Sequence, residues 1–157
     1  GTSLVILQNE IPQEVNMEIA LKAKKADVKV WLNAAPAREL PNRLIKVVDL
    51  LILNQVEAEF YSSLNRSVKV LKTLGAQGVY YDDVLYSGFS VDVVSTHGAG
   101  DMFVGALAAQ VVRGTPMVEA IRFAQAAAAL TVSSQQEKRK DLRAQSVIKF
   151  LAGQESL

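Results

Sequence analysis

Short, nearly continuous apolar runs alternate along the chain with longer segments in which apolar residues recur at helical spacing. The runs at 4–8, 28–33 and 49–54 are separated by helical patterns at 12–25 and 43–48. Strands of a parallel sheet covered by helices are apolar at almost every position, whereas strands with one face exposed to solvent alternate between apolar and polar residues. The first third of the chain therefore predicts a β-α-β-α-β arrangement around a parallel sheet.

The rest of the pattern predicts a helix at 57–61, a strand at 68–73, antiparallel strands at 78–82 and 86–94 with a turn near Asp82 and Asp83, and helices at 102–113, 116–132 and 142–152. The alanine run at 126–129 favours close packing between helices. The link between the helix at 57–61 and the next strand is shorter than the roughly one dozen residues of a parallel crossover. We therefore expect residues to be missing between about Ser62 and Asn65.

Composition and charge limit the class of protein. The 157 residues fit one domain, 50% of them are hydrophobic, and the net charge of +1 gives no reason to expect nucleic-acid or membrane binding. The absence of cysteine excludes disulfides and favours a cytoplasmic protein, and no apolar run is long enough to span a membrane. The basic run at 138–140 lies between Glu137 and Asp141, so we expect a solvated surface there.

The tetrapeptide Gly98-Ala99-Gly100-Asp101 stands at the start of the helix predicted at 102–113. Glycines let a ligand approach the backbone, and the first turn of a helix offers unpaired N–H groups and a positive dipole end. These features are typical of a phosphate site. A phosphate repels a neighbouring carboxylate, so the position of Asp101 calls for a reason. A functional reason is that the carboxylate takes the proton from an attacking hydroxyl. The alternative is that Asp101 caps the helix and the glycines form a tight turn.

Polar side chains follow each of the four predicted parallel strands. Glu10 comes after the first strand, Asn33 ends the second, Asn54 and Glu57 follow the third, and a glycine-bearing loop at 73–78 follows the fourth. Ligands of open α/β sheets bind at the edge formed by the carboxyl ends of the strands. We therefore expect these residues to lie along one edge of the sheet.

Each of these positions has a functional and a purely structural interpretation. The Asn54 amide can donate to a phosphate oxygen and Glu57 can hold hydrated Mg²⁺, or the two can form a capping box. The loop at 73–78 can cradle a nucleotide through its N–H groups, or be an ordinary turn between strands. Glu10 can accept hydrogen bonds from a polyol, or be a first-turn glutamate that the helix dipole favours.

In combination these residues resemble the C-terminal half of the ribokinase branch of the PfkB family of carbohydrate kinases. The motifs that carry the resemblance are Gln8-Asn9-Glu10-Ile11-Pro12, the run from Asn33 to Leu40, Asn54-x-x-Glu57, Thr73-Leu74-Gly75-x-x-Gly78, and Gly98-Ala99-Gly100-Asp101 followed by Phe103. The resemblance implies an α/β fold, a three-layer α/β/α sandwich with a mainly parallel central sheet. Residues 1–157 would form its ATP-binding and catalytic part.

The resemblance also implies an activity, the transfer of the γ-phosphate of Mg·ATP to the 5-hydroxyl of D-ribose. Asp101 would be the catalytic base, and the backbone at Gly98, Ala99, Gly100 and Asp101 would form the anion hole. The remaining roles that the resemblance implies are nucleotide binding by Asn54, Thr73, Gly75, Gly78 and Gln125, magnesium binding through water by Glu57, and sugar binding by Glu10 and Asp101.

The sequence departs from the family in three respects. Ser95 stands where the family commonly has an aspartate that helps to hold an activating monovalent cation, so we expect weak potassium dependence. The family's Gly-Ala-x-Pro-Ser segment after the alanine-rich helix is absent. The family's N-terminal half, with most sugar-binding residues and a β lid used for dimerisation, has no counterpart here, and we expect the working protein to contain more chain.

Two other functions fit the same residues. One is another sugar or nucleoside kinase of the PfkB family, because the substrate-selecting residues of the family lie mostly in the half that is missing here. The other is a non-catalytic nucleotide-binding fragment or pseudokinase.

Overall fold

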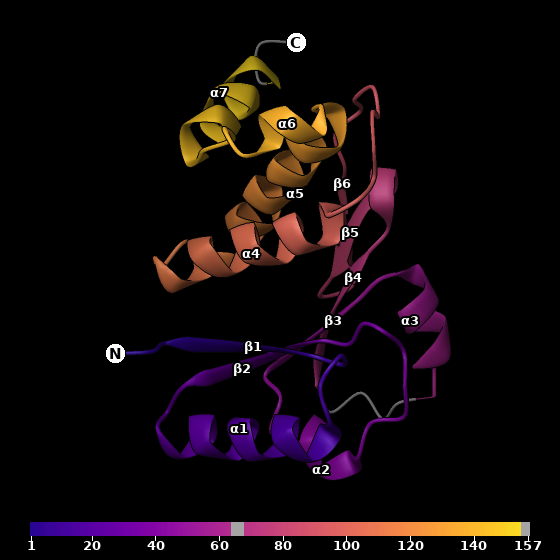
Figure 1. The fold of residues 1–157 in the computed structure, drawn as a ribbon, viewed down its shortest axis with the longest axis vertical. Helices are drawn as coiled ribbons and strands as arrows, with labels where there is room; N and C mark the ends of the chain where they lie inside the picture. The colour runs from indigo at the N-terminus through magenta and orange to yellow at the C-terminus, as the bar shows by residue number, and fades with distance from the viewer. Residues whose placement is uncertain (64–67, 155–157) are drawn as a thin grey trace. The chain divides into compact units, whose positions relative to one another are not determined.

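The computed structural model describes residues 1–63 and 68–154 of the chain (Figure 1). The expected gap between about Ser62 and Asn65 therefore lies partly outside the described residues. The chain divides into two compact units, one made of Gly1–Gly75 with Val79–Leu85 and the other of Ala76–Gly78 with Tyr86–Leu157.

A mixed sheet runs in the order β1-β2-β3-β4-β5-β6. Its strands are β1 (Leu4–Gln8), β2 (Lys29–Asn33), β3 (Leu50–Leu53), β4 (Lys69–Thr73), β5 (Gly78–Tyr81) and β6 (Val84–Ser87). The first four pair in parallel, each with its neighbour in sequence, and β5 pairs antiparallel with β4. The parallel sheet predicted from the apolar runs is confirmed.

The helices of the first unit are α1 (Gln13–Lys25), α2 (Asn42–Ile45) and α3 (Gln55–Phe60). Successive right-handed crossovers between strands in sequential order bring the connecting helices to the same face of a sheet. The buried cluster on that face takes Ala20 and Ala23 from α1, Leu44 from α2, and Val30 and Leu32 from β2. Figure 1 shows α1 and α2 on the same side of β1 and β2.

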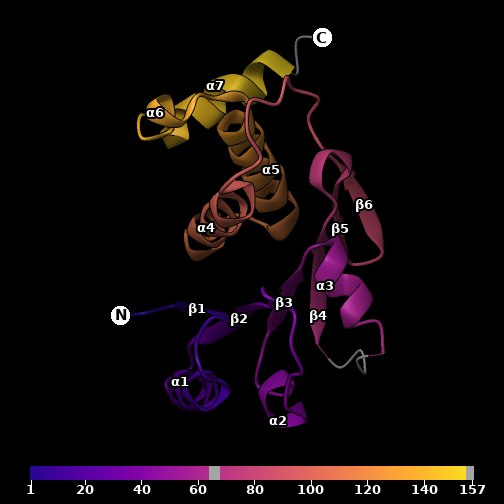
Figure 2. The same cartoon turned by 45° about the vertical axis from the view of Figure 1, so that its right-hand side comes forward.

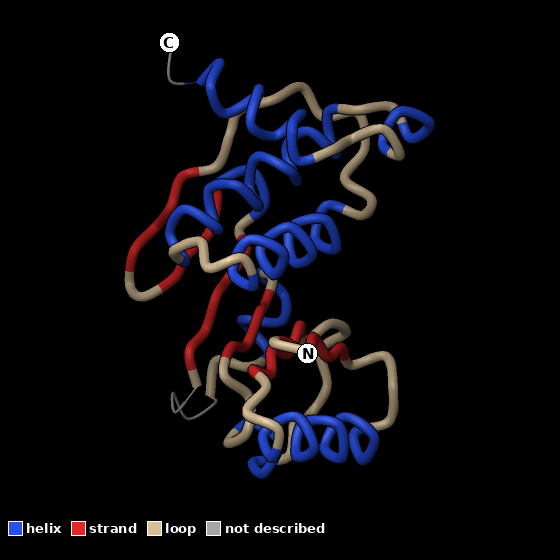
Figure 3. The backbone as a smooth tube through the Cα atoms, turned by 90° about the vertical axis from the view of Figure 1, so that its left-hand side faces the viewer, coloured by secondary structure: helices blue, strands red, loops and turns tan. Residues whose placement is uncertain are grey.

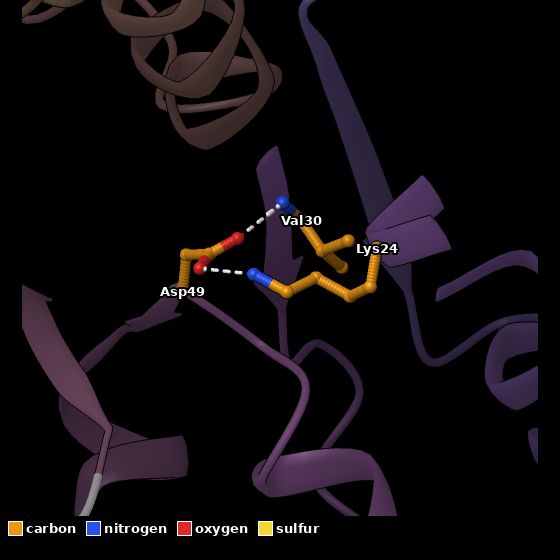
Figure 4. Close-up of polar contacts among 3 residues, drawn as sticks. All are labelled: Lys24, Val30 and Asp49. Carbon is orange, nitrogen blue, oxygen red and sulfur yellow. Dashed lines mark hydrogen bonds and ion pairs between the residues drawn. The ribbon is translucent and has the colours of Figure 1, made fainter. Parts of the chain in front are cut away.

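Asp49 joins three elements of the first unit at the start of β3 (Figure 4). Its carboxylate accepts hydrogen bonds from Lys24 Nζ of α1 at 2.7 Å and from the Val30 N–H of β2 at 2.7 Å. Burial acts to raise the pKa of the Asp49 carboxyl, but these two bonds and the charges of Lys24 and Lys29 outweigh it and hold the pKa below its usual value.

We expect Asp49→Asn to lower the free energy of unfolding by about 1 kcal/mol at neutral pH, since the partly exposed charge is lost and the amide keeps only one of the two acceptor oxygens. A carboxylate whose pKa is lower in the folded state stabilises above its unfolded pKa of about 3.9, and this contribution is lost as the pH falls through the folded value. The difference between variant and wild type should therefore shrink below about pH 4, which urea denaturation at several pH values measures. Glu18→Gln removes an exposed carboxylate paired only with Lys22 and should change stability little.

A two-residue turn at Asp82 and Asp83 joins β5 to β6. Both residues have positive φ, 51° and 60°, as the two central residues of a type I′ hairpin turn require. The turn is where the sequence predicts it, but the second strand ends at Ser87 and not at 94. Its partner β5 has only four residues, so the pairing that would extend the strand stops there.

The second unit is helical after β6, as the tube in Figure 3 shows. Its helices are α4 (Ala99–Val112), α5 (Met117–Ser133), α6 (Gln136–Arg139) and α7 (Ala144–Gln154). α4 and α5 lie side by side (Figure 2), and Ala120, Ala124, Ala126, Ala127 and Ala129 are buried. The close helix packing predicted from the alanine run is confirmed. Among the helices of residues 1–63 and 68–154, none has the length and hydropathy needed to cross a bilayer.

Candidate active site

The turn before α4 places Asp101 in the first turn of a helix. Gly98 is the N-cap residue in the left-handed region, with φ 75°, and the helix begins at Ala99. The helix therefore starts three residues earlier than the apolar pattern predicts. Because Gly98 occupies the cap position without a side-chain cap bond, the alternative that Asp101 caps this helix is wrong.

Two backbone amides at the start of α4 are free to bind an anion. The Ala99 N–H donates to Thr96 O at 3.2 Å and the Met102 N–H donates to Gly98 O at 3.0 Å. Among the described residues, the N–H groups of Gly100 and Asp101 have no acceptor. Of the four residues whose backbone the family resemblance assigns to the anion hole, Ala99 thus has its amide engaged, whereas Gly100 and Asp101 offer free N–H groups in the first turn of α4.

The space around Gly98 and Gly100 is open. A Cβ built at either residue meets no atom of the described chain within 4 Å. Gly98 needs its positive φ, but Gly100 has ordinary helical backbone, where glycine is less stable than alanine. Neither packing in the described residues nor backbone conformation requires glycine at position 100, and the open space leaves room for a ligand to approach the backbone.

We expect Gly100→Ala to leave the fold intact while weakening the binding of an anion at the start of α4. Alanine in a helix is up to about 1 kcal/mol more favourable than glycine, so the unfolding midpoint should stay or rise. The new Cβ would narrow the approach to the two free amides, so phosphoryl transfer should fall by about tenfold or more. Thermal melting and ADP release on the same protein measure both, and a parallel loss of stability and activity would contradict the interpretation.

The Asp101 side chain is exposed beside the free amides. No hydrogen bond or ion pair within residues 1–63 and 68–154 engages its carboxylate. The carboxylate is therefore available to accept a proton from a hydroxyl that approaches the start of α4.

Arg139, at the end of α6, contacts the turn that precedes α4. Its guanidinium donates to His97 O at 2.7 Å and to Ser95 O at 2.9 Å, and its Nε donates to Ser134 O at 3.2 Å. Lys138 and Lys140 are exposed, as expected for the basic run at 138–140. The expectation of a solvated surface is wrong for Arg139, because three main-chain carbonyls of the same unit hold its side chain.

In the first unit, the carboxyl ends of the parallel strands carry the other candidates. Glu10 follows β1, Asn33 ends β2, Asn54 follows β3 and Thr73 ends β4. Glu10 is exposed and precedes α1, which begins at Gln13, so it is not a first-turn glutamate. The prediction that these residues lie along one edge of the sheet is confirmed.

Asn54 and Glu57 form the capping box of α3. The Glu57 N–H donates to Asn54 Oδ1 at 3.0 Å, and the Asn54 N–H donates to Glu57 Oε2 at 2.7 Å. Glu57 is buried, and the described residues hold no group of three or more histidine, cysteine, aspartate or glutamate side chains. A single carboxylate suits Mg²⁺, which keeps several waters and usually binds one or two carboxylates together with substrate phosphates.

Two residues that the sequence analysis did not assign hold the loop after β2. The buried Asn9 side-chain amide shares its two N–H groups among three acceptors, Ala34 O at 3.1 Å, Pro36 O at 3.0 Å and the Tyr61 hydroxyl at 3.1 Å. The Tyr61 hydroxyl in turn donates to Arg38 O at 2.6 Å. These bonds fix the loop beside Asn33 and Glu10.

The two glycines of the loop at 73–78 are required for different reasons. Gly75 has φ 59° and opens a 3₁₀ turn, with no neighbouring atom of the described residues near the place of a Cβ. Gly78 has φ 116°, and a Cβ there would lie 2.1 Å from Tyr86 O and 2.6 Å from Gly88 N. Thr73 Oγ1 lies 3.4 Å from Leu53 O. Gly78 thus has a packing role that the sequence did not indicate.

Gln125 lies buried on α5, and its side-chain amide donates to Tyr86 O of β6 at 2.8 Å. The candidate residues therefore fall into two groups. Glu10, Asn54, Glu57, Thr73 and Gly75 belong to the first unit, and Gly78, Gly98, Ala99, Gly100, Asp101 and Gln125 belong to the second.

The fold and the turn before α4 define an α/β protein with free backbone amides and an exposed carboxylate at the start of one helix. The family model described as pfkB family carbohydrate kinase matches residues 1–141, and the chain belongs to the PfkB family of carbohydrate kinases. It is 36% identical over 143 residues to the ribokinases of Lactococcus lactis and Bacillus subtilis, covering 83% of this chain and 48% and 49% of theirs. The chain thus spans about half the length of the curated relatives it matches.

The solved structures agree with this assignment. The Arabidopsis thaliana ribokinase complexed with ribose and ATP superposes with a TM-score of 0.83 at 30% identity. The match covers 94% of this chain and 55% of that one. The α/β fold expected from the resemblance is confirmed as that of the ribokinases.

Proposed function

We propose that the protein is an ATP-dependent sugar kinase that phosphorylates D-ribose at its 5-hydroxyl. The observation that carries the proposal is the start of α4, where the unpaired Asp101 carboxylate stands beside the two free amides of Gly100 and Asp101. The curated ribokinase relatives, and the bound ribose and ATP in the Arabidopsis structure, support the choice of substrates.

The chemistry follows from these groups. Asp101 accepts the proton of the sugar hydroxyl as the oxygen attacks the γ-phosphorus, and the bond from that phosphorus to the leaving oxygen of ADP breaks. The N–H groups of Gly100 and Asp101 and the positive end of α4 stabilise negative charge on the transferring phosphoryl group. Because the amides are part of a helix, they need little rearrangement during the reaction.

The remaining residues would bind and orient the reactants. Glu57 would hold Mg²⁺ through water, and the ion supplies positive charge that neutralises the phosphate oxygens. The backbone amide of Asn54 donates to one Glu57 oxygen, which orients this carboxylate. We assign nucleotide binding to Asn54, Thr73, Gly75, Gly78 and Gln125, and contact with the sugar to Glu10 and Asp101.

The test is ADP release from Mg·ATP by the purified protein, with and without D-ribose. Ribose-dependent release supports the proposal, and release with another sugar or a nucleoside alone would assign a different PfkB substrate. Nucleotide binding by calorimetry without turnover on any acceptor would favour a non-catalytic nucleotide-binding protein.

A further inference from the structure

Three main-chain carbonyl groups converge on the guanidinium of Arg139. Two of them, Ser95 O and His97 O, belong to the turn before α4, and the third, Ser134 O, belongs to the end of α5. The same two segments are also joined by the Val94 and Ser95 N–H groups, which both donate to Val132 O, at 2.7 and 3.1 Å. Arg139 thus completes a connection between the anion-binding turn and the end of α5.

Carbonyl oxygens that converge on one point repel each other unless a positive group lies between them. The guanidinium suits this position because it is permanently charged and carries five N–H donors in a rigid planar fork. Converging main-chain carbonyls are also a ligand set for a monovalent metal ion such as potassium. The side chain of Arg139 supplies the positive partner that these three carbonyls share.

The bond to His97 O bears directly on the free amides. In an α-helix the N–H of residue i donates to the carbonyl of residue i−4, so the natural acceptors for the amides of Gly100 and Asp101 are the carbonyls of Thr96 and His97. Thr96 O already accepts from the Ala99 N–H, and His97 O accepts from Arg139. The N–H groups of the first turn of a helix have no intrahelical acceptor, and these two bonds hold the carbonyls of the preceding turn in place beside them.

We propose that Arg139 is a positioning residue for the anion site at the start of α4, and that its guanidinium acts as a cation built into the chain. The inference rests on the proposed function of the Gly98–Asp101 turn. It also gives a physical reason for the expected weak potassium dependence, since the three carbonyls already have a positive partner.

The first test measures ADP release by Arg139→Ala. A shift of the turn by about 1 Å costs on the order of 100-fold in rate, so we expect a loss of that size in kcat. Millimolar guanidinium chloride or potassium chloride should restore part of the rate in Arg139→Ala and not stimulate the wild type. Arg139→Lys keeps the positive charge but not the planar fork of donors, so its kcat should lie between those of wild type and Arg139→Ala. Loss without rescue by either cation would overturn the proposal.

Arg143→Ala is the matched control. Arg143 is also an arginine of this segment, but among residues 1–63 and 68–154 its guanidinium donates to the neighbouring carbonyls of Lys140 and Leu142 alone. Removing it changes the net charge equally and leaves the turn before α4 untouched. Its kcat should stay within about twofold of wild type, as for surface changes away from a site. An equal loss of kcat in both arginine variants would mean that the effect comes from the change in net charge, and would overturn the proposal.

Amide hydrogen exchange separates this inference from the proposed kinase activity. Exchange at 95–101 should become faster in Arg139→Ala, return toward wild type with guanidinium, and remain unchanged in Arg143→Ala. Unchanged exchange in Arg139→Ala would overturn the role of Arg139, whatever the rate assay gives. Absence of turnover in wild type with every acceptor would instead overturn the proposed function. The hydrogen-exchange result would then be the test of the positioning role of Arg139.

Discussion

Asp101→Asn should abolish sugar-dependent ADP release while leaving ATP binding nearly unchanged. A positioned general base contributes roughly 10²- to 10⁴-fold, and the amide of asparagine cannot take its place because it does not accept a proton at neutral pH. The two free N–H groups at the start of α4 are backbone groups and persist in the variant. The loss should therefore fall on kcat, with little change in the affinity for nucleotide.

The measurement pairs a coupled ADP assay with titration calorimetry of ATP. Asp141→Asn is the control, because Asp141 is an exposed carboxylate of the same unit that lies outside α4. If Asp101→Asn kept a rate near that of Asp141→Asn, the base would have to be another group.

Gly78→Ala should destabilise the protein by roughly 3 kcal/mol or more, from backbone strain and overpacking together. A φ of 116° is unfavourable for any residue with a Cβ. The Cβ would also lie 2.1 Å from Tyr86 O, and a backbone atom cannot rotate away as the end of a side chain can. The only relief is a displacement of β6 and of Gly88, and this would strain the hairpin.

Urea denaturation of Gly78→Ala beside Gly105→Ala measures this effect. Gly105 lies within α4 with ordinary φ and no described atom near the place of a Cβ, so alanine there should be neutral or stabilising by up to about 1 kcal/mol. A Gly78→Ala variant as stable as Gly105→Ala would mean that the close approach of Tyr86 is not present in solution.

The parallel part of the sheet could be predicted because its strands are apolar at nearly every position. The pattern fails where elements carry few apolar residues. Helix α4 begins at Ala99, but its first turn holds Gly100 and Asp101, so the apolar spacing starts only at Met102. Helix α6 consists of Gln136–Arg139, has no buried face, and was not predicted.

In the candidate site, too, residues that are close together in the sequence could be predicted, and a contact between distant residues could not. The glycines and Asp101 lie within four consecutive positions, so the sequence could place them together at the start of a helix, and their chemistry stays a prediction. Asn54 and Glu57 have the spacing of a capping box, which the structure contains, and a binding role for them stays a prediction. Arg139 could not be predicted, because it contacts His97 across 42 residues of sequence through a main-chain carbonyl, and every residue type has such a carbonyl.

The path of the chain through the β5–β6 hairpin has a consequence for protein engineering. The chain passes from one unit to the other after Gly75, after Gly78 and after Leu85. No single cut therefore separates the units, and a cut within this stretch would leave one fragment with residues that belong to the other unit. Chimeras that exchange the residues proposed to bind nucleotide up to the start of the hairpin, Asn54, Thr73, Gly75 and Gly78, should keep the hairpin whole, with the junction in the irregular stretch at 88–94, where no strand or helix is interrupted.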